Sequence, residues 1–261
     1  MVSIKQTKQS VLRLTDAYVE GLKQMTEPQL RQVLSGDPHE AAVWVRMAAQ
    51  AGIAAGQVRL GRMLLAGEGV LKNEAAAFAW FQRAAGQSDA DGLNMLGRCY
   101  ENGWGTPANP PAAYRSFVSS ARLGDAWGQY NLGHCYLDGA GVARDFRLAF
   151  FWYSRAADQG HDRAMNLLAR CYEQGWGVAS DWETACAWYR MSAEAGYFRG
   201  QFNWATVLAA EGDYTQAAEW FMAAARNGAP GVREAVLAVL AASEHPEFKR
   251  CLSFVRNLCG E

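Results

Sequence analysis

The stretch RCYENGWG at residues 98–105 recurs as RCYEQGWG at residues 170–177, with one substitution in eight positions. The copies are 72 residues apart, and related segments align without a gap at half that spacing, 36 residues. Four units share the pattern: RLGRMLLAGEGV (59–70), MLGRCYENGWGT (95–106), NLGHCYLDGAGV (131–142) and LLARCYEQGWGV (167–178). A fixed period of about 20–50 residues is typical of repeat proteins, in which each unit buries its apolar face against its neighbours.

The second half of each unit has the features of a helix with marked ends. It reads AFAWFQRAA (77–85), AYRSFVSSA (113–121), AFFWYSRAA (149–157) and ACAWYRMSA (185–193). Short polar side chains suited to N-capping precede it, at Asp37, Asn73, Asn109, Asp145, Asp181 and Asp213. Glycines suited to a left-handed C-terminal cap follow it, at Gly52, Gly124, Gly160, Gly196 and Gly228. A tryptophan column within it is expected to consist of packing residues, Trp44, Trp80, Trp152, Trp188 and Trp220.

The first half of each unit is helical by its spacing. Leu60, Gly61 and Leu64, and their counterparts in later units, lie on a single helical face. The small residue lets a neighbouring helix approach closely. Glycine pairs at 67/69, 103/105, 139/141 and 175/177 then provide permissive backbone for a turn. One helical pair cannot bury its own apolar face, so the sequence predicts an all-α fold, an α-solenoid of stacked 36-residue helix-turn-helix repeats with helical caps.

The chain divides accordingly into three predicted parts. Residues 1–36 hold N-terminal capping helices and a partial first repeat, including an amphipathic helix at 4–24 and a capping box formed by Thr26 and Gln29. Residues 37–228 hold the repeat array, and residues 229–261 a C-terminal capping pair of helices. Either end could instead be a dimer contact, so a homo-oligomer through the terminal helices stays open.

Composition and motifs exclude several classes of function. A formal net charge of -1 argues against a general nucleic-acid binder, and no apolar stretch is long enough for membrane insertion, so a cytoplasmic protein is expected. Cys99, Cys135 and Cys171 recur at the repeat spacing and are expected to be buried thiols. The histidines lack metal-binding spacing, and no nucleophile elbow, Walker loop or dinucleotide fingerprint is present. We therefore expect no enzymatic activity, no cofactor and no metal.

The segment NLGHCYLDGAGVARDFRLAFFWYSRAADQG (131–160) resembles the Sel-one-like repeat family, a branch of the tetratricopeptide superfamily. The resemblance covers about residues 37–228, and the third unit departs from it with Thr106 for Val and Ser116 for Trp. It implies a scaffold that binds protein partners and no chemistry of its own. The abundance of the family in bacteria implies a bacterial origin.

The columns at 55, 58, 62 and 65 vary among units and form one continuous helical face. In tetratricopeptide-like arrays this face lines a concave groove. The candidate partner-binding residues are Asn94, Arg98, Glu101, Trp127, Tyr130, His134, Asn166, Arg170, Glu173 and Phe202. The arginines would bind carboxylates, the asparagines would bond a peptide backbone, and Tyr130 with Trp127 would hold an apolar side chain.

Several alternatives stay open from the sequence. The Arg98–Glu101 and Arg170–Glu173 neighbours could be solvated pairs, and the asparagines could brace an adjacent helix. Trp104 and Trp176 could pack on the following helix or stand out as contact anchors. The leading function is a scaffold that binds a protein or peptide partner in the groove. An inhibitor of the immunity type, which blocks a folded effector through a broad surface, is the alternative, and an enzyme is a remote one.

Overall fold

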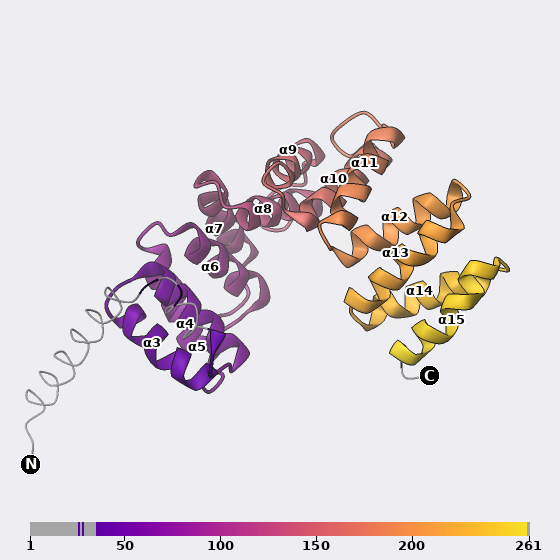
Figure 1. The fold of residues 1–261 in the computed structure, drawn as a ribbon. Helices are drawn as coiled ribbons and strands as arrows, with labels where there is room; N and C mark the ends of the chain where they lie inside the picture. The colour runs from indigo at the N-terminus through magenta and orange to yellow at the C-terminus, as the bar shows by residue number, and fades with distance from the viewer. Residues whose placement is uncertain (1–25, 27, 29–34, 260–261) are drawn as a thin grey trace, which may run out of the picture. The chain divides into compact units, whose positions relative to one another are not determined.

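The computed structural model describes residues 26, 28 and 35–259, and all regular secondary structure in this part of the chain is helical (Figure 1). The helices are α3 (Pro38–Gln50), α4 (Ala54–Ala66), α5 (Glu74–Ala85), α6 (Ala90–Asn102), α7 (Pro110–Arg122), α8 (Ala126–Asp138), α9 (Phe146–Ala157), α10 (Asp162–Gln174), α11 (Trp182–Glu194), α12 (Phe198–Ala210), α13 (Tyr214–Asn227), α14 (Pro230–Ala242) and α15 (Pro246–Cys259). The all-α repeat fold predicted from the sequence is therefore confirmed. The helix expected at residues 4–24 and the capping box that needs Gln29 lie outside the described residues.

The chain forms two compact units. The first comprises residues 1–128 with 140–142, and the second residues 129–139 with 143–261. Consecutive helices pack on one another from α3 to α7 in the first unit and from α9 to α13 in the second. The first helices of successive repeats also meet, because α4 contacts α6 and α10 contacts α12. Each unit is thus built from helical hairpins stacked side by side.

The predicted N-caps are present in every repeat. Asp37, Asn73, Asn109, Asp145, Asp181 and Asp213 each accept a hydrogen bond from a backbone N–H in the first turn of the helix that follows. Four of the five predicted capping glycines have a left-handed backbone, with φ between 83° and 92°. Gly228 is the exception, with φ −84° and ψ 155°. The prediction was wrong there because α14 begins only two residues later, and an extended residue makes that direct connection.

The small column of the first helix is where two helices meet most closely. A Cβ added to Gly97 would lie 2.5 Å from the ring of Phe117, which is fully buried. Gly61 has the same relation to Phe81, and Gly133 to Tyr153. Close packing of this kind leaves no room for an extra carbon without displacing the ring. The small residue therefore sets the separation of the two helices in each of these hairpins.

The tryptophan column is a packing column, as the sequence predicted, although it is not the most deeply buried one. Trp80, Trp188 and Trp220 are partly exposed and pack at the edges of the apolar clusters. The deepest rings belong to the next position along the helix, which holds Phe81, Phe117, Tyr153, Tyr189 and Phe221. The tryptophan is the more uniform of the two positions in the sequence. The position after it, although more variable, contributes the most deeply buried side chains.

The second glycine of each Gly-x-Gly pair has two roles. Gly105 has φ 69°, and a Cβ added to it would lie 2.2 Å from the carbonyl oxygen of Glu74, at the start of α5. Gly69, Gly141 and Gly177 approach Pro38, Pro110 and Phe146 in the same way. The first glycine of the pair, such as Gly103 with φ 74°, has its nearest neighbour at 3.6 Å. The loop of one repeat thus packs on the backbone of the helix that opens the second half of the repeat before it.

Alternate repeats use different polar contacts, which explains the 72-residue spacing. In one phase a buried glutamine of the first helix accepts a hydrogen bond from a glutamine in the loop that follows the second helix of the same repeat: Gln87 donates to Gln57 at 2.9 Å and Gln159 to Gln129 at 2.7 Å. In the other phase a serine hydroxyl donates to a backbone carbonyl 30 residues earlier, from Ser120 to Ala90 and from Ser192 to Asp162, both at 2.8 Å. The two-repeat period is therefore built into the packing.

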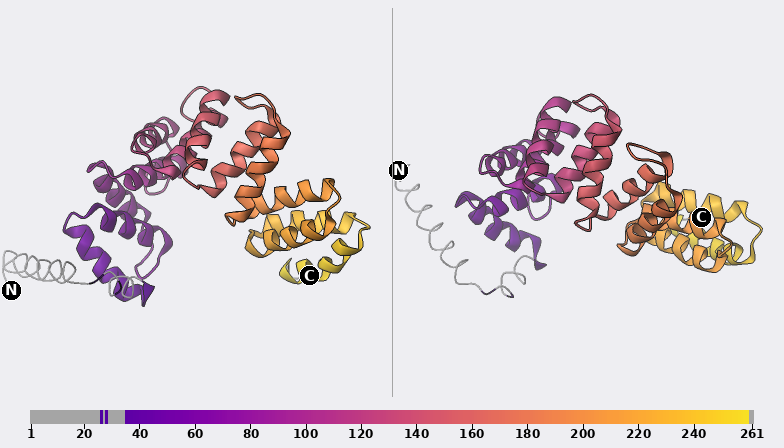
Figure 2. Two further views of the ribbon diagram at one scale, coloured as in Figure 1. Left: turned by 45° about the horizontal axis from the view of Figure 1, so that its top comes forward. Right: turned by 90° about the horizontal axis from the view of Figure 1, so that it is seen from above.

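The C-terminal helices behave as the predicted apolar pair. Val236, Leu240, Phe248 and Val255 are buried in one cluster with residues of α13. Figure 2 shows α14 and α15 lying beside α13 in both views. The large apolar side chains of residues 230–259 are all buried or partly buried.

The glycine pair gives a matched test of the packing. Gly103→Ala and Gly105→Ala impose a similar left-handed strain, on the order of 1–2 kcal/mol. Only Gly105→Ala also drives a methyl group into a backbone carbonyl, which adds about 1–3 kcal/mol of overpacking. We expect urea unfolding to show the larger loss for Gly105→Ala. Equal losses for the two variants would contradict the close approach.

Candidate protein-binding surface

Each unit contains a pocket on the helical face that the variable columns predicted. The first pocket lies in the first unit and is lined by Arg62, Leu65, Ala66, Asn94, Met95, Arg98, Trp104 and Trp127. The second pocket lies in the second unit and has a volume of about 440 Å³. Its lining comprises Tyr130, His134, Leu137, Asp138, Asn166, Leu167, Arg170, Tyr197, Arg199, Phe202, Asn203, Val232 and Ala235.

Eight of the ten candidate residues line one pocket or the other. Asn94, Arg98 and Trp127 belong to the first, and Tyr130, His134, Asn166, Arg170 and Phe202 belong to the second. Glu101 and Glu173 line neither pocket. Glu173 instead accepts a hydrogen bond of 2.9 Å from the hydroxyl of Tyr189. In the preceding repeat the position of Glu173 holds Leu137, and the buried hydroxyl of Tyr153 has no hydrogen-bond partner within residues 35–259.

The two asparagines are more buried than a binding role predicts. Asn94 is 3% exposed and Asn166 is 4% exposed. The side-chain oxygen of Asn166 accepts a hydrogen bond of 2.7 Å from Asn203 on α12. Asn166 therefore braces the neighbouring helix, which was the structural alternative for these residues. The amides form part of the pocket floor.

Trp104 and Trp176 both pack onto the repeats, and Trp104 also lines the first pocket. The guanidinium of Arg98 lies 5.0 Å from the Trp104 ring centroid, and that of Arg170 lies 4.9 Å from Trp176. The Trp176 ring also stacks on Phe146, with centroids 6.0 Å apart and an interplanar angle of 13°. A cation over an aromatic face is attracted by the ring quadrupole. The repeated RCYE-x-GWG phrase thus encodes an arginine and the ring that orients it.

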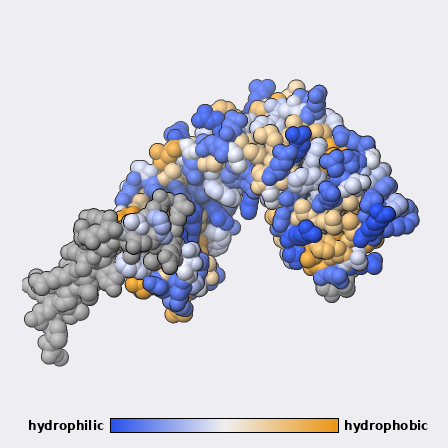
Figure 3. Space-filling view, in the orientation of Figure 1, coloured by the Kyte–Doolittle hydropathy of each residue, from blue (hydrophilic) through white to orange (hydrophobic). Residues whose placement is uncertain are grey.

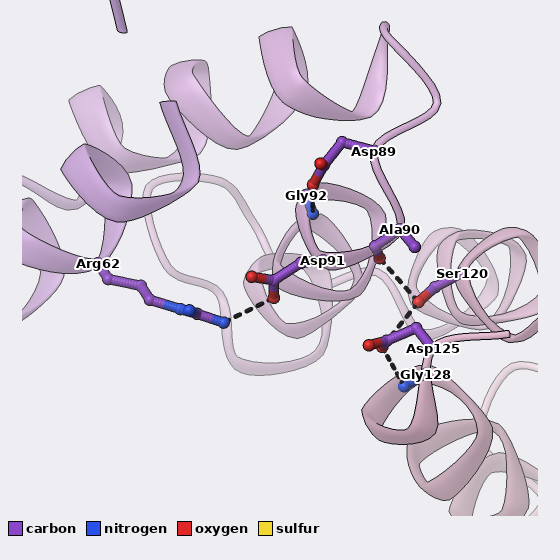
Figure 4. Close-up of polar contacts among 8 residues, drawn as sticks. All are labelled: Arg62, Asp89, Ala90, Asp91, Gly92, Ser120, Asp125 and Gly128. Carbon is purple, nitrogen blue, oxygen red and sulfur yellow. Dashed lines mark hydrogen bonds and ion pairs between the residues drawn. The ribbon is translucent and has the colours of Figure 1, made fainter. Parts of the chain in front are cut away.

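An ion pair lies beside the first pocket, between Arg62 of its lining and Asp91 (Figure 4). The guanidinium of Arg62, on α4, donates to the Asp91 carboxylate, on α6, at 2.6 Å. Burial raises the pKa of Asp91, and the Arg62 charge opposes that rise. Nearby, Asp89 and Asp125 cap the starts of α6 and α8 through the backbone N–H groups of Gly92 and Gly128.

The second pocket has an aromatic wall beneath its polar rim. The Tyr130 ring stacks on His161, with centroids 4.8 Å apart, and meets His134 edge-on at 4.7 Å. His134 in turn lies edge-on to Tyr153 at 5.6 Å. Burial lowers the pKa of His134, the Asp138 carboxylate opposes this, and the charges of Arg170 and Arg199 lower it further. The pocket is therefore positive around a neutral imidazole.

Sequence reasoning missed Arg199 and Tyr197. The signal was present, because the variable column at position 55 continues as Asp91, Trp127, Arg163 and Arg199. Read in order, this column changes from acidic to aromatic to basic along the array. Trp127 is the only residue of this column among the candidates predicted from the sequence.

The three cysteines that recur at the repeat spacing are buried. Burial raises the pKa of the Cys99 and Cys171 thiols to about 12, so they remain protonated and packed. Within the described ranges, no group of three or more His, Cys, Asp or Glu side chains is arranged to hold a metal ion. None of the described helices is long and apolar enough to cross a bilayer.

Stacked helical hairpins of this kind define a class, the α-solenoid proteins of the tetratricopeptide type. The Sel1 repeat pattern matches residues 30–53, 54–89, 90–125, 128–161, 162–197 and 200–228, and the chain belongs to the Sel1 repeat family. Proteins of this family generally mediate protein–protein interactions, and their fold is typically non-catalytic. No curated protein matches the chain in sequence.

Solved structures show the same fold. A protective antigen of uropathogenic Escherichia coli, c5321, is 28% identical with a TM-score of 0.70, covering 100% of this chain and 56% of its own. The chain thus spans little more than half the length of that protein. A Sel1 repeat protein from Oxalobacter formigenes is 26% identical with a TM-score of 0.75, covering 87% of this chain and 97% of its own. The immunity protein Pa5087 from Pseudomonas aeruginosa, 17% identical with a TM-score of 0.56 and covering 79% and 80%, shares the fold.

The two buried histidines predict how stability depends on pH. Burial lowers the pKa of both His134 and His161, so below about pH 6.5 the unfolded chain binds more protons than the folded one. The free energy of unfolding should therefore fall as the pH drops from about 7 to about 5. The double variant His134→Gln, His161→Asn should show a flatter profile in urea unfolding, and the asparagine keeps an N-cap at position 161. A profile as steep as that of the wild type would show that these imidazoles are not responsible.

Proposed function

We propose that this protein is a non-enzymatic interaction scaffold that binds a segment of a partner protein in the second pocket. The observation that carries the proposal is the origin of the pocket walls. Most of the repeat residues in these walls belong to the variable columns of α8, α10 and α12, and α14 adds Val232 and Ala235. No residue of the constant columns at 60, 61 and 64 lines the pocket, because those columns pack between helices. Fold and binding surface therefore draw on different residues of the same helices.

The chemistry of the second pocket suits a protein segment. Leu137, Phe202 and Val232 offer apolar surface, and Tyr130 and Arg170 are residue types enriched where interfaces gain most of their affinity. Figure 3 shows apolar surface over the C-terminal helices with strongly hydrophilic residues beside it. An apolar centre with a polar rim is the usual anatomy of a protein interface.

The cellular setting is part of the same proposal. All six cysteines carry free thiols, and three of them fill equivalent buried positions. Free thiols are usual in a reducing compartment. This supports a cytoplasmic location, and the bacterial sources of the similar structures support a bacterial origin.

Filling the pocket tests the proposal without removing any contact. Ala235 is exposed on α14 and lines the second pocket, so Ala235→Trp should occupy it. Ala241 is exposed on the same helix outside the pocket lining, and Ala241→Trp is the matched control. We expect affinity capture from native lysate, read by mass spectrometry, to lose its partner with Ala235→Trp and to keep it with Ala241→Trp.

Two outcomes would contradict this proposal. Equal capture by both variants would remove the pocket from the binding surface. Capture that requires the intact folded partner, with no binding of its short fragments in calorimetry, would favour an inhibitor of the immunity type instead. Binding of a fragment by the wild type, and its loss in Ala235→Trp, would support the scaffold.

A further inference from the structure

The first unit contains an ion pair whose counterpart in the second unit consists of two positive charges. Arg62 and Asp91 pair at 2.6 Å between α4 and α6 (Figure 4). Three 36-residue periods, or 108 residues, further along the chain, the same two columns hold Arg170 on α10 and Arg199 on α12. An aspartate in the first unit is thus replaced by an arginine in the second.

The repeat geometry places the second pair as it places the first. The contact of α4 with α6 has its equivalent in the contact of α10 with α12. Arg170 and Arg199 line the same pocket. Both also lower the pKa of His134, so both charges act on that imidazole from nearby. Two guanidinium groups therefore face one space where the first unit has a carboxylate and a guanidinium.

No carboxylate of residues 35–259 forms an ion pair with Arg170 or Arg199. Asp138 lines the same pocket, and it raises the pKa of His134 against the two arginines. The face of the Arg170 guanidinium is taken up by Trp176. The donors of a guanidinium lie around its edge, so stacking orients the group and leaves those donors for a ligand.

We infer that the second pocket binds an acidic side chain of the partner segment, with its carboxylate between Arg170 and Arg199. The Asp91 carboxylate beside Arg62 shows, within this chain, the ligand that the arrangement accepts. Phe202 and Val232 line the same pocket and would hold an apolar residue next to the acidic one. This inference rests on the proposed function, because it names the chemistry of the segment bound at that site.

The probe is an array of synthetic heptapeptides whose central residue is fixed as aspartate, asparagine or phosphoserine, with randomised flanks. The wild-type protein should bind the aspartate set about ten- to a hundred-fold more strongly than the asparagine set, the range expected for a charge-assisted hydrogen bond. The selected flanks should be rich in apolar residues. Equal binding of the aspartate and asparagine sets would overturn the inference, and so would a preference for phosphoserine, which would indicate a phosphate site.

Arg199→Asp rebuilds the pair of the first unit, so that the chain supplies its own carboxylate to Arg170. This variant should lose the preference for aspartate while its thermal unfolding midpoint stays the same or rises. Arg155→Asp, which makes the same charge change at an exposed site of α9 outside the pocket lining, should keep the preference. An aspartate preference that survives in Arg199→Asp, or that is lost equally in Arg155→Asp, would overturn the inference.

The failure of this inference differs from the failure of the proposed function. If Ala235→Trp abolishes capture of the partner while Arg199→Asp leaves peptide selection unchanged, the scaffold stands and the acidic ligand is wrong. If Ala235→Trp leaves capture unchanged, the pocket itself is not the binding surface.

Discussion

The packing of each helical hairpin depends on a very small side chain, or none, at one position of its first helix. In the first helix of the repeats, Gly61, Gly97 and Gly133 face an aromatic ring of the second helix so closely that a Cβ would overlap it. The ring is then buried completely, as at Phe81 and Phe117. Later repeats hold Ala169 and Ala205 in this column, and both are also buried. Small residues on one helix and large rings on the other fix the hairpin, and the hairpin is the unit that stacks.

This division of labour explains how one fold can carry a variable surface. The contacts that hold the repeats together use the small column, the ring column and the turn glycines. Polar contacts add a second level that alternates between repeats, with Gln57 and Gln129 in one phase and Ser120 and Ser192 in the other. The variable column that holds Asp91 and Arg199 takes no part in these contacts. It can therefore change from Asp91 to Arg199 without disturbing them.

Much of the fold could be predicted because its signals are local and repeated. N-caps, turn glycines and the apolar period each depend on a few neighbouring residues, and six copies reinforce one another. The left-handed conformation predicted for Gly228 was wrong because the conformation of this residue depends on where the next helix begins. The position after the tryptophan was not recognised as the core position because its residue type changes among Val45, Phe and Tyr. The side chain is buried in every repeat.

The candidate pocket residues were predictable in position and less so in chemistry. Helical spacing placed Arg98 and Arg170 on the variable face of the first helices, and both line pockets. Spacing could not show that Asn166 is engaged by Asn203, or that Glu173 turns to Tyr189, because those contacts join different helices. The consequence of the opposite charges of Asp91 and Arg199 could not be predicted from their own column. It depends on the arginine of the preceding repeat, Arg62 in one case and Arg170 in the other.

The most direct test of this account is a double-mutant cycle between Gly97 and Phe117. Gly97→Ala should destabilise the wild-type protein, because the added methyl group meets the Phe117 ring at 2.5 Å. In a Phe117→Leu background the same methyl group has space, so its cost should largely disappear, with a coupling free energy of about 1–3 kcal/mol measured by urea unfolding. Additive effects of the two substitutions would contradict the claim that this contact sets the separation of the helices.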